Sequence, residues 1–203
     1  RSPALLAKTA ASLDAISNGR LELGVGLGWQ EEEYEASGIS FDQRAKIFWE
    51  TLDICQSLWK GGPVSHKGEI FEFNDIWCHP TPPQGSDIPL LFGVKMTESN
   101  AQKIAKIGHG WIPIKTSRDF ISEGSEKLNN AFKEAGRDDK PRIRGQLPTC
   151  VDSNGVPSVD LTLKELEKSM EAGLEEIEVF PINFAQSPDH LREVLELIGE
   201  LKK

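Results

Sequence analysis

The sequence predicts an α/β protein built on a parallel sheet. The main observation is a helix followed by five repeats of strand and helix, an order typical of helices that connect parallel strands. The predicted strands are short and mostly apolar, as strands buried on both faces are. Two architectures fit this pattern, the open doubly wound sheet and the eight-stranded barrel. Five strands in 203 residues favour the open sheet, because a barrel needs eight strands and typically about 250 residues.

Apolar residues at helical spacing indicate the helices, and short apolar runs indicate the strands. In the first helix, Leu6, Ala10, Leu13 and Ile16 form the stripe that is expected to face the core. The predicted helices span residues 4–16, 43–60, 98–107, 119–135, 162–172 and 188–201, and the predicted strands span residues 20–27, 88–92, 110–114, 142–151 and 176–180.

Two segments depart from this alternation. Residues 30–42 are polar and acidic, and they lead from a strand into the next long helix. In residues 61–87, glycines and prolines indicate irregular loop, while residues 64–73 alternate like a short antiparallel pair. We expect residues 61–87 to form an insert or lid at the C-terminal rim of the strands, with few contacts to the core.

Composition excludes several classes of function. There are 32 acidic against 23 basic residues, a formal net charge of -9, which would repel a phosphate backbone and argues against nucleic-acid binding. No run reaches about eighteen apolar residues, so no membrane span is expected. Three distant cysteines indicate a cytoplasmic protein rather than a disulfide-bonded one, and the histidines lack metal-site spacing. Because the chain opens on Arg1, we expect it to be part of a longer protein.

Three glycines lie at alternate positions in the segment Gly24–Trp29. They let a neighbour approach the backbone where a strand ends, although such glycines also serve simply to pack a sheet. The segment is not a dinucleotide fingerprint, which needs G-x-G-x-x-G opening directly into a helix. Here acidic residues follow instead, and they would repel a pyrophosphate.

A second candidate site is the turn from Phe92 to Ser99, where a buried strand leads into a helix. The first turn of a helix presents unpaired N–H groups and a partial positive charge, and Lys95 adds a full charge. A phosphate group would be stabilised there. The alternative is an ordinary strand-to-helix turn in which Thr97 caps the helix.

Several segments together resemble the bacterial luciferase-like family, and most closely its F-420-dependent oxidoreductases. The resemblance covers nearly the whole chain and is strongest in its first half. Two positions depart from the family pattern, because Val94 replaces a second glycine and His109 replaces an aspartate. The segments that carry the resemblance are Leu5–Trp29, Leu58-Trp59, Phe71–Phe73, Pro89–Gly93 and Gly108–Trp111.

The resemblance implies a (β/α)8 barrel of the TIM type, of which this chain holds the C-terminal five strand–helix units as a single partial domain, residues 1–203. It also implies a deazaflavin cofactor, coenzyme F-420, or alternatively flavin mononucleotide (FMN). The strand end near residue 28 would lie close to the ring or the substrate, and the turn after residue 92 would hold the phosphate. The cofactor-binding residues implied in this way are Gly26, Gly28, Trp29, Gly93, Val94, Lys95, Met96 and Ser99.

The implied function is hydride transfer between coenzyme F-420 and a small organic substrate. One alternative is an FMN-dependent monooxygenase on the same barrel, and another is a non-catalytic flavin-binding partial barrel. The non-catalytic alternative is serious because the outer strands of a five-stranded sheet have unpaired edges. Pairing of such an edge with a second copy of the chain would give a homodimer. The resemblance assigns no catalytic residue to this chain, since the family's residues from the first three strands have no counterpart in it.

Overall fold

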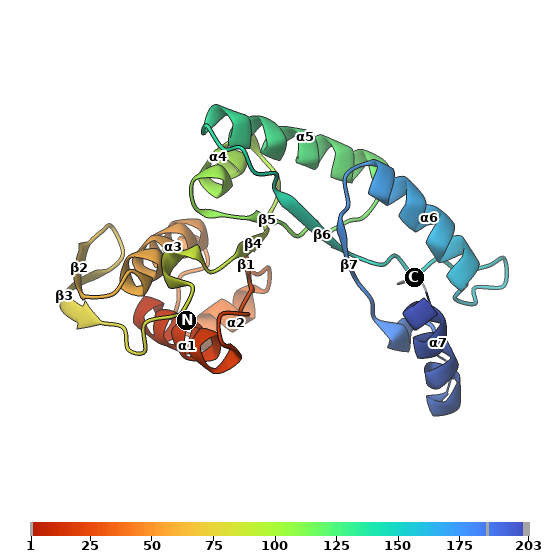
Figure 1. The fold of residues 1–203 in the computed structure, drawn as a ribbon, viewed down its shortest axis with the longest axis horizontal. Helices are drawn as coiled ribbons and strands as arrows, with labels where there is room; N and C mark the ends of the chain where they lie inside the picture. Colours follow the sequence, from red (N-terminus) through yellow and green to blue (C-terminus); the bar gives the residue numbers. More distant parts are fainter. Residues whose placement is uncertain (1, 186, 201–203) are drawn as a thin grey trace. The chain divides into compact units, whose positions relative to one another are not determined.

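Figure 1 shows the computed structural model, which describes residues 2–185 and 187–200. The chain folds as two compact units, Arg1–Leu91 and Phe92–Lys203. The first unit contains α1 (Pro3–Ser17), β1 (Leu23–Gly26), α2 (Glu31–Ala36), α3 (Arg44–Trp59), β2 (Pro63–Lys67), β3 (Glu72–Trp77), the 3-10 turn η1 (Gly85–Asp87) and the start of β4 (Leu90–Gly93). The second contains α4 (Glu98–Ile107), β5 (Gly110–Trp111), α5 (Arg118–Glu134), β6 (Arg142–Gln146), α6 (Val159–Glu171), β7 (Glu176–Glu178), η2 (Pro181–Asn183) and α7 (Pro188–Glu200).

The strand order is β1-β4-β5-β6-β7, and β5, β6 and β7 pair in parallel. An open doubly wound sheet reverses its strand order partway, so the preference for that fold based on strand count was wrong. Sequential order with intervening helices is the arrangement of a parallel barrel. Strand β6 is shorter than the predicted 142–151, because the chain turns and Val151 forms an isolated antiparallel bridge with Pro157.

Helices α1 and α3 pack against each other in the first unit. The buried residues of α1 are Pro3, Ala7, Ala10, Ala11 and Asp14, whereas the predicted stripe residues Leu13 and Ile16 are 50% and 83% exposed. That part of the prediction was wrong because small residues bring the two helices close together. The larger apolar side chains come from α3.

The close approach of α1 and α3 is visible in two contacts. The Trp59 indole N–H donates a hydrogen bond of 3.0 Å to the carbonyl oxygen of Ala7. The Cys55 thiol lies 3.6 Å from the carbonyl oxygen of Pro3. Burial raises the pKa of this thiol to about 12, with a further contribution from Cys78. Cys55 is therefore a packing residue rather than a nucleophile.

Residues 30–42, for which the sequence pattern indicated no element, contain the short helix α2. Three glutamates occupy its first turn, where the partial positive charge of a helix N-terminus stabilises acidic side chains. The Ser37 hydroxyl donates to the Glu33 carbonyl oxygen at 2.7 Å, and Gly38 follows with a φ of 66°. A helix this short shows no apolar periodicity, so the sequence pattern did not reveal it.

Within the insert, β2 and β3 pair antiparallel in a sheet of their own, as predicted. The predicted position at the C-terminal rim was wrong. Gln84 donates from its backbone N–H to Asp14 at 3.0 Å and from its side chain to the Leu21 carbonyl oxygen at 2.9 Å. Leu21 precedes β1, so this end of the insert lies at the N-terminal edge of that strand. The reason is topological, because the insert leaves the end of a helix and leads into the start of a strand.

Glu50 of α3 holds the hairpin in place. Its carboxylate accepts hydrogen bonds from the N–H groups of Ile70 and Phe71, at 3.1 and 2.8 Å, and lies 3.1 Å from His66 Nε2. Burial alone would raise the pKa of Glu50, but the hydrogen bonds from Phe71, His66 and Ile70 outweigh it and the pKa is lowered. The ionised form is thus the one that the fold stabilises.

We expect Glu50→Ala to lower the free energy of unfolding by about 1–2 kcal/mol at neutral pH, since charge-assisted hydrogen bonds are lost. Because the folded pKa is lowered, this stabilisation is present above the unfolded pKa of about 4.3 and is lost as the pH falls through the folded value. Urea unfolding between pH 3 and 7 would measure it. Glu69→Ala, which removes an exposed ion pair with Lys46, is the control and should change little.

The second unit is a row of helices over the last strands, because α4 contacts α5 and α5 contacts α6. Its core contains fully buried Phe92, Ile104, Trp111, Leu128 and Phe132. The final helix was predicted to reach residue 201, which lies outside the described residues; α7 extends to Glu200.

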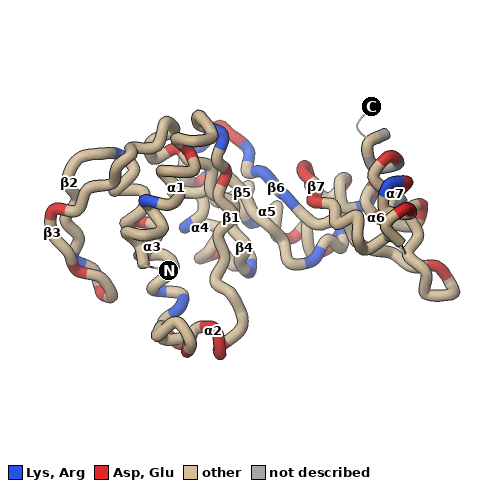
Figure 2. The backbone as a smooth tube through the Cα atoms, turned by 90° about the horizontal axis from the view of Figure 1, so that it is seen from below, with Lys and Arg blue, Asp and Glu red and all other residues tan. Residues whose placement is uncertain are grey.

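Basic and acidic residues are interspersed along the described parts of both units, without a continuous basic stripe (Figure 2). On β6 and β7, for example, Glu176 forms ion pairs with Arg142 and Arg144. Among the helices within residues 2–185 and 187–200, none has both the length and the apolar character needed to cross a lipid bilayer.

Candidate functional site

The turn between β4 and α4 is shaped by its own polar groups. Thr97 is the N-cap of α4, and its hydroxyl accepts a hydrogen bond of 3.2 Å from the Asn100 N–H. The Asn100 side chain in turn donates to the Lys95 carbonyl oxygen at 2.9 Å. Thr97 therefore caps α4, as expected for an ordinary strand-to-helix turn. Capping uses only one of the first N–H groups, so it leaves the phosphate interpretation open.

The N–H groups of Glu98 and Ser99 precede the capped position. A helix gives its first N–H groups no acceptor of its own, and within residues 2–185 and 187–200 these two have no backbone or side-chain acceptor. They lie beside Lys95, whose side chain is exposed. Unpaired N–H groups next to a cation are what an anion at a helix N-terminus requires.

A pocket of about 430 Å³ opens at this turn, and we call it the α4 pocket. One wall is the buried Trp111 ring, whose indole N–H donates to the Val94 carbonyl oxygen at 2.9 Å. The first half of α5 packs against this ring and contributes further lining residues. The lining residues are Lys95, Met96, Thr97, Glu98, Trp111, Phe120, Glu123, Gly124 and Lys127.

The α4 pocket carries charges of both signs. Lys127 and Glu123, one turn apart on α5, form a salt bridge. Their hydrogen bond lowers the pKa of Glu123 and raises the pKa of Lys127, so both remain charged at neutral pH. Lys95 and Glu98 add one further charge of each sign. An anion in the pocket would gain from the two lysines and the N–H groups, while the two carboxylates would oppose it.

The residues implied for phosphate binding all lie on or next to this turn. Gly93 ends β4, Val94 and Met96 are buried, and Lys95 and Ser99 are exposed. Of these five, Lys95 and Met96 line the α4 pocket. All five residues thus lie at the C-terminal end of β4 or just after it. Their role in binding a cofactor remains a prediction.

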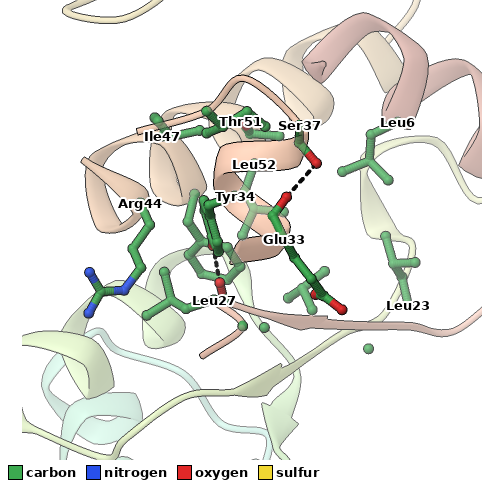
Figure 3. A pocket seen from close by; sticks show the side chains of 16 residues that line it. Leu6, Leu23, Leu27, Glu33, Tyr34, Ser37, Arg44, Ile47, Thr51 and Leu52 are labelled. Atoms are coloured by element: carbon green, nitrogen blue, oxygen red, sulfur yellow. Dashed lines mark hydrogen bonds between the residues drawn. The ribbon is translucent and has the colours of Figure 1, made fainter. Parts of the chain in front are cut away.

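The residues implied at the end of β1 are not all brought together. Gly26 and Gly28 line a pocket of about 520 Å³ within the first unit, which we call the β1 pocket (Figure 3). Gly28 has a φ of 72°, and a side chain there would meet the Tyr34 ring at 3.5 Å. Trp29 is 84% exposed and is not part of the lining. Only the two glycines therefore share a pocket.

Sequence reasoning missed the residues that close both pockets. In the β1 pocket, the Tyr34 hydroxyl donates to the Leu27 carbonyl oxygen and its ring meets Phe41 edge-on at 5.3 Å. Tyr34 is the single tyrosine of the sequence, a signal that could have drawn attention to it. In the α4 pocket, the spacing of Glu123 and Lys127 by four residues could have predicted their ion pair.

No cluster of three or more histidine, cysteine or acidic side chains in the described part of the chain is arranged to hold a metal ion.

Comparison with known proteins gives a family match. The profile of the luciferase-like monooxygenase family matches residues 1–156. An uncharacterized protein of Mycobacterium tuberculosis is 37% identical over 142 residues, which cover 70% of this chain and 49% of the relative. Pyrimidine monooxygenase RutA of Serratia proteamaculans is 36% identical over 94 residues, 44% of this chain and 25% of that enzyme. The chain thus spans about half the length, or less, of these curated relatives.

Solved structures share the fold at low sequence identity. The coenzyme F-420-dependent tetrahydromethanopterin reductase of Methanopyrus kandleri aligns with a TM-score of 0.72 and 17% identity, covering 96% of this chain and 77% of the reductase. The oxygenating constituent of 3,6-diketocamphane monooxygenase of Pseudomonas putida, solved with FMN, aligns with a TM-score of 0.62 and 22% identity. That alignment covers 75% of this chain and 46% of the oxygenase.

Proposed function

Because the chain belongs to the luciferase-like monooxygenase family, we propose that it binds coenzyme F-420 and takes part in hydride transfer between this deazaflavin and a small organic substrate. The observation that carries the proposal is the turn between β4 and α4, with unpaired N–H groups at Glu98 and Ser99 beside Lys95. The reductase from Methanopyrus kandleri, whose fold this chain shares, uses the same coenzyme.

The residues of the turn fit a phosphate group. The Glu98 and Ser99 N–H groups would donate to its oxygens, and Lys95 would neutralise part of its charge. Asn100 would keep the turn in shape, because its side chain already bonds the Lys95 carbonyl oxygen. Glu98 and Glu123 reduce the attraction, and the salt bridge of Lys127 would have to open for that lysine to contribute.

In this proposal the chain binds and orients the cofactor, and the bound deazaflavin supplies the redox chemistry. The β4–α4 turn fixes the phosphate end. Trp111, fully buried and bonded to the Val94 carbonyl oxygen, keeps the turn against α5. At the end of β1, Gly26 and Gly28 leave room for a ring or substrate to approach the backbone. These roles are proposals, because the chain spans about half the length, or less, of its curated relatives.

An FMN-dependent monooxygenase is the second candidate. It is favoured by the 36% identity to a pyrimidine monooxygenase and by the fold shared with an oxygenase solved with FMN. Both cofactors carry a phosphate, so the same turn would serve either one. The cofactor ring, not the phosphate, separates the two candidates.

Titration of the chain with F-420 and, separately, with FMN tests the proposal. We expect F-420 to bind more tightly, with its fluorescence as the measurement and inorganic phosphate as a competitor. Tighter binding of FMN would favour the monooxygenase, and binding of neither would favour a non-catalytic protein.

Lys95→Ala should weaken cofactor binding by about tenfold or more, because one charge-assisted contact of about 1.5–3 kcal/mol is lost. Lys106→Ala is the matched control, since Lys106 is also an exposed lysine but lies in the last turn of α4, at the other end of that helix from the Lys95 turn. Equal affinities of the two variants in fluorescence titrations would contradict the phosphate role of the turn.

A further inference from the structure

The two lysines of the α4 pocket are in different situations. Lys95, on the turn after β4, forms no ion pair within residues 2–185 and 187–200. Lys127, on α5, is paired with Glu123, whose carboxylate lies 2.5 Å from its ammonium group. One of the two cations that an anion would meet in this pocket is therefore already neutralised by the protein itself.

The partners of this ion pair differ in exposure. The Lys127 side chain is 28% exposed, whereas the Glu123 side chain is 71% exposed. The lysine is thus held against the protein, and the glutamate reaches it from the solvent side. Because an ion pair with one well-exposed partner is weak, Glu123 can turn back into solvent while Lys127 stays in the pocket.

The Glu123 carboxylate is also within the influence of Lys95. Its pKa is lowered first by the hydrogen bond from Lys127 and by the charge of that lysine, with a further contribution from Lys95. Two lysines on separate elements therefore act on one carboxylate. A phosphate group bound at the same turn would be attracted by the same two charges.

Glu98, the other carboxylate of the pocket, has a different role. It lies in the first turn of α4, where an acidic side chain stabilises the start of the helix. With Glu123 in place, the two lysines and two glutamates of the lining cancel. With Glu123 turned into solvent, the lining carries a positive excess, which favours an anion.

The alternative explanation is an ordinary pair that stabilises the helix. A glutamate four residues before a lysine is the favoured order on an exposed helix face. Helix α6 carries a comparable pair, Glu165 and Lys168 at 2.8 Å, which lines neither pocket. The two explanations differ in one respect, since a pair of the ordinary kind would have no effect on anion binding.

We propose that Glu123 is an internal substitute for the phosphate group of the ligand. In the free protein it neutralises Lys127, and the phosphate binds by displacing it from that lysine. This inference rests on the proposed function, because it takes the β4–α4 turn as the phosphate site. It adds a residue on a separate helix that lowers the affinity and assists release, since Glu123 pairs with Lys127 again as the phosphate leaves.

Inorganic phosphate at constant ionic strength is the probe, and the amide NMR shifts of Glu98 and Ser99 report its binding. Glu123→Gln should bind phosphate about fivefold more tightly than the parent, because the anion then gains the attraction of an unpaired Lys127. Glu126→Gln is the matched control. Glu126 is an exposed neighbour on α5 that also acts on Lys127 but does not line the pocket, so its loss should change affinity by less than about twofold.

A double-mutant cycle with Lys127→Met separates displacement from simple repulsion. Repulsion between Glu123 and the phosphate needs no lysine, so it would give the same gain in the Lys127→Met background. Displacement needs the lysine, so in that background the gain from Glu123→Gln should fall below about twofold. Thermal unfolding of each variant shows that the affinities are compared between folded proteins.

Three results would overturn the proposal: no gain from Glu123→Gln, an equal gain from Glu126→Gln, or an equal gain in the two backgrounds of the cycle. Absence of phosphate shifts at Glu98 and Ser99 in both the parent and Glu123→Gln would overturn it together with the phosphate role of the turn. F-420 titrations of the same variants keep the proposed function separate. A coupled gain for phosphate without any binding of F-420 would support the role of Glu123 and contradict the proposed cofactor.

Discussion

Gly124→Ala should lower the free energy of unfolding by about 1–3 kcal/mol, the usual cost of overpacking in a core. In an exposed helix the same change would add about 1 kcal/mol of stability. Here the new methyl group would overlap the six-membered ring of Trp111. That ring is fully buried and bonded to the Val94 carbonyl oxygen, so it has no free space to move into, and the steric term outweighs helix propensity.

Chemical denaturation measures this loss, and Gly199→Ala is the matched control. Gly199 is also a helix glycine, but a methyl group there would meet no atom within 4 Å. We expect Gly199→Ala to leave stability unchanged or raise it slightly. A Gly124 variant as stable as the parent would mean that Trp111 does not occupy its position in solution, and the wall of the α4 pocket would have to be redrawn.

Much of the fold follows from local patterns in the sequence. Each strand–helix repeat was predicted because an apolar run such as Leu90–Gly93 precedes a capped amphipathic helix such as Glu98–Ile107. The choice between an open sheet and a barrel did not follow from those patterns, because both architectures use the same repeat. It came from the resemblance, and the sequential strand order agrees with it.

Two of the errors concern contacts between distant segments. The burial of Ala7 and Ala11 instead of Leu13 and Ile16 depends on which face of α1 meets α3, and helical periodicity does not say which partner a face meets. Residues 61–87 were predicted at the C-terminal rather than the N-terminal edge of the strands. Their glycines and prolines indicate an irregular loop but do not say at which edge of the sheet that loop lies. Their position follows from the preceding helix and the following strand.

The candidate site was predictable only in part, for the same reason. The turn at Gly93–Ser99 is contiguous in sequence, so a strand end followed by a capping residue was enough to find it. The wall made by Trp111, Gly124 and Lys127 depends on how β5 and α5 pack, and no local pattern encodes that contact. The β1 pocket likewise joins four separate elements.

Gly93→Asp should weaken cofactor binding by about tenfold or more while the fold survives. The change adds a side chain where β4 ends, at a point where a phosphate would approach the backbone. It also adds a negative charge near the first N–H groups of α4, where charge-assisted contacts are worth about 1.5–3 kcal/mol each. Since about 1.4 kcal/mol corresponds to a factor of ten in affinity, the loss of one such contact is enough.

Two further variants separate charge from bulk. Gly93→Ala adds bulk without charge, whereas Ser99→Asp adds the same charge in the first turn of α4, where an acidic residue stabilises the free helix. If a phosphate binds there, Ser99→Asp should raise the melting temperature and still lower affinity, a combination that simple damage to the fold would not produce. Titrations with reduced F-420 and reduced FMN, together with thermal unfolding, provide the measurement. Unchanged affinity of Gly93→Asp for both cofactors would remove the phosphate from this turn, because no phosphate held by these N–H groups could tolerate a carboxylate beside it at no cost.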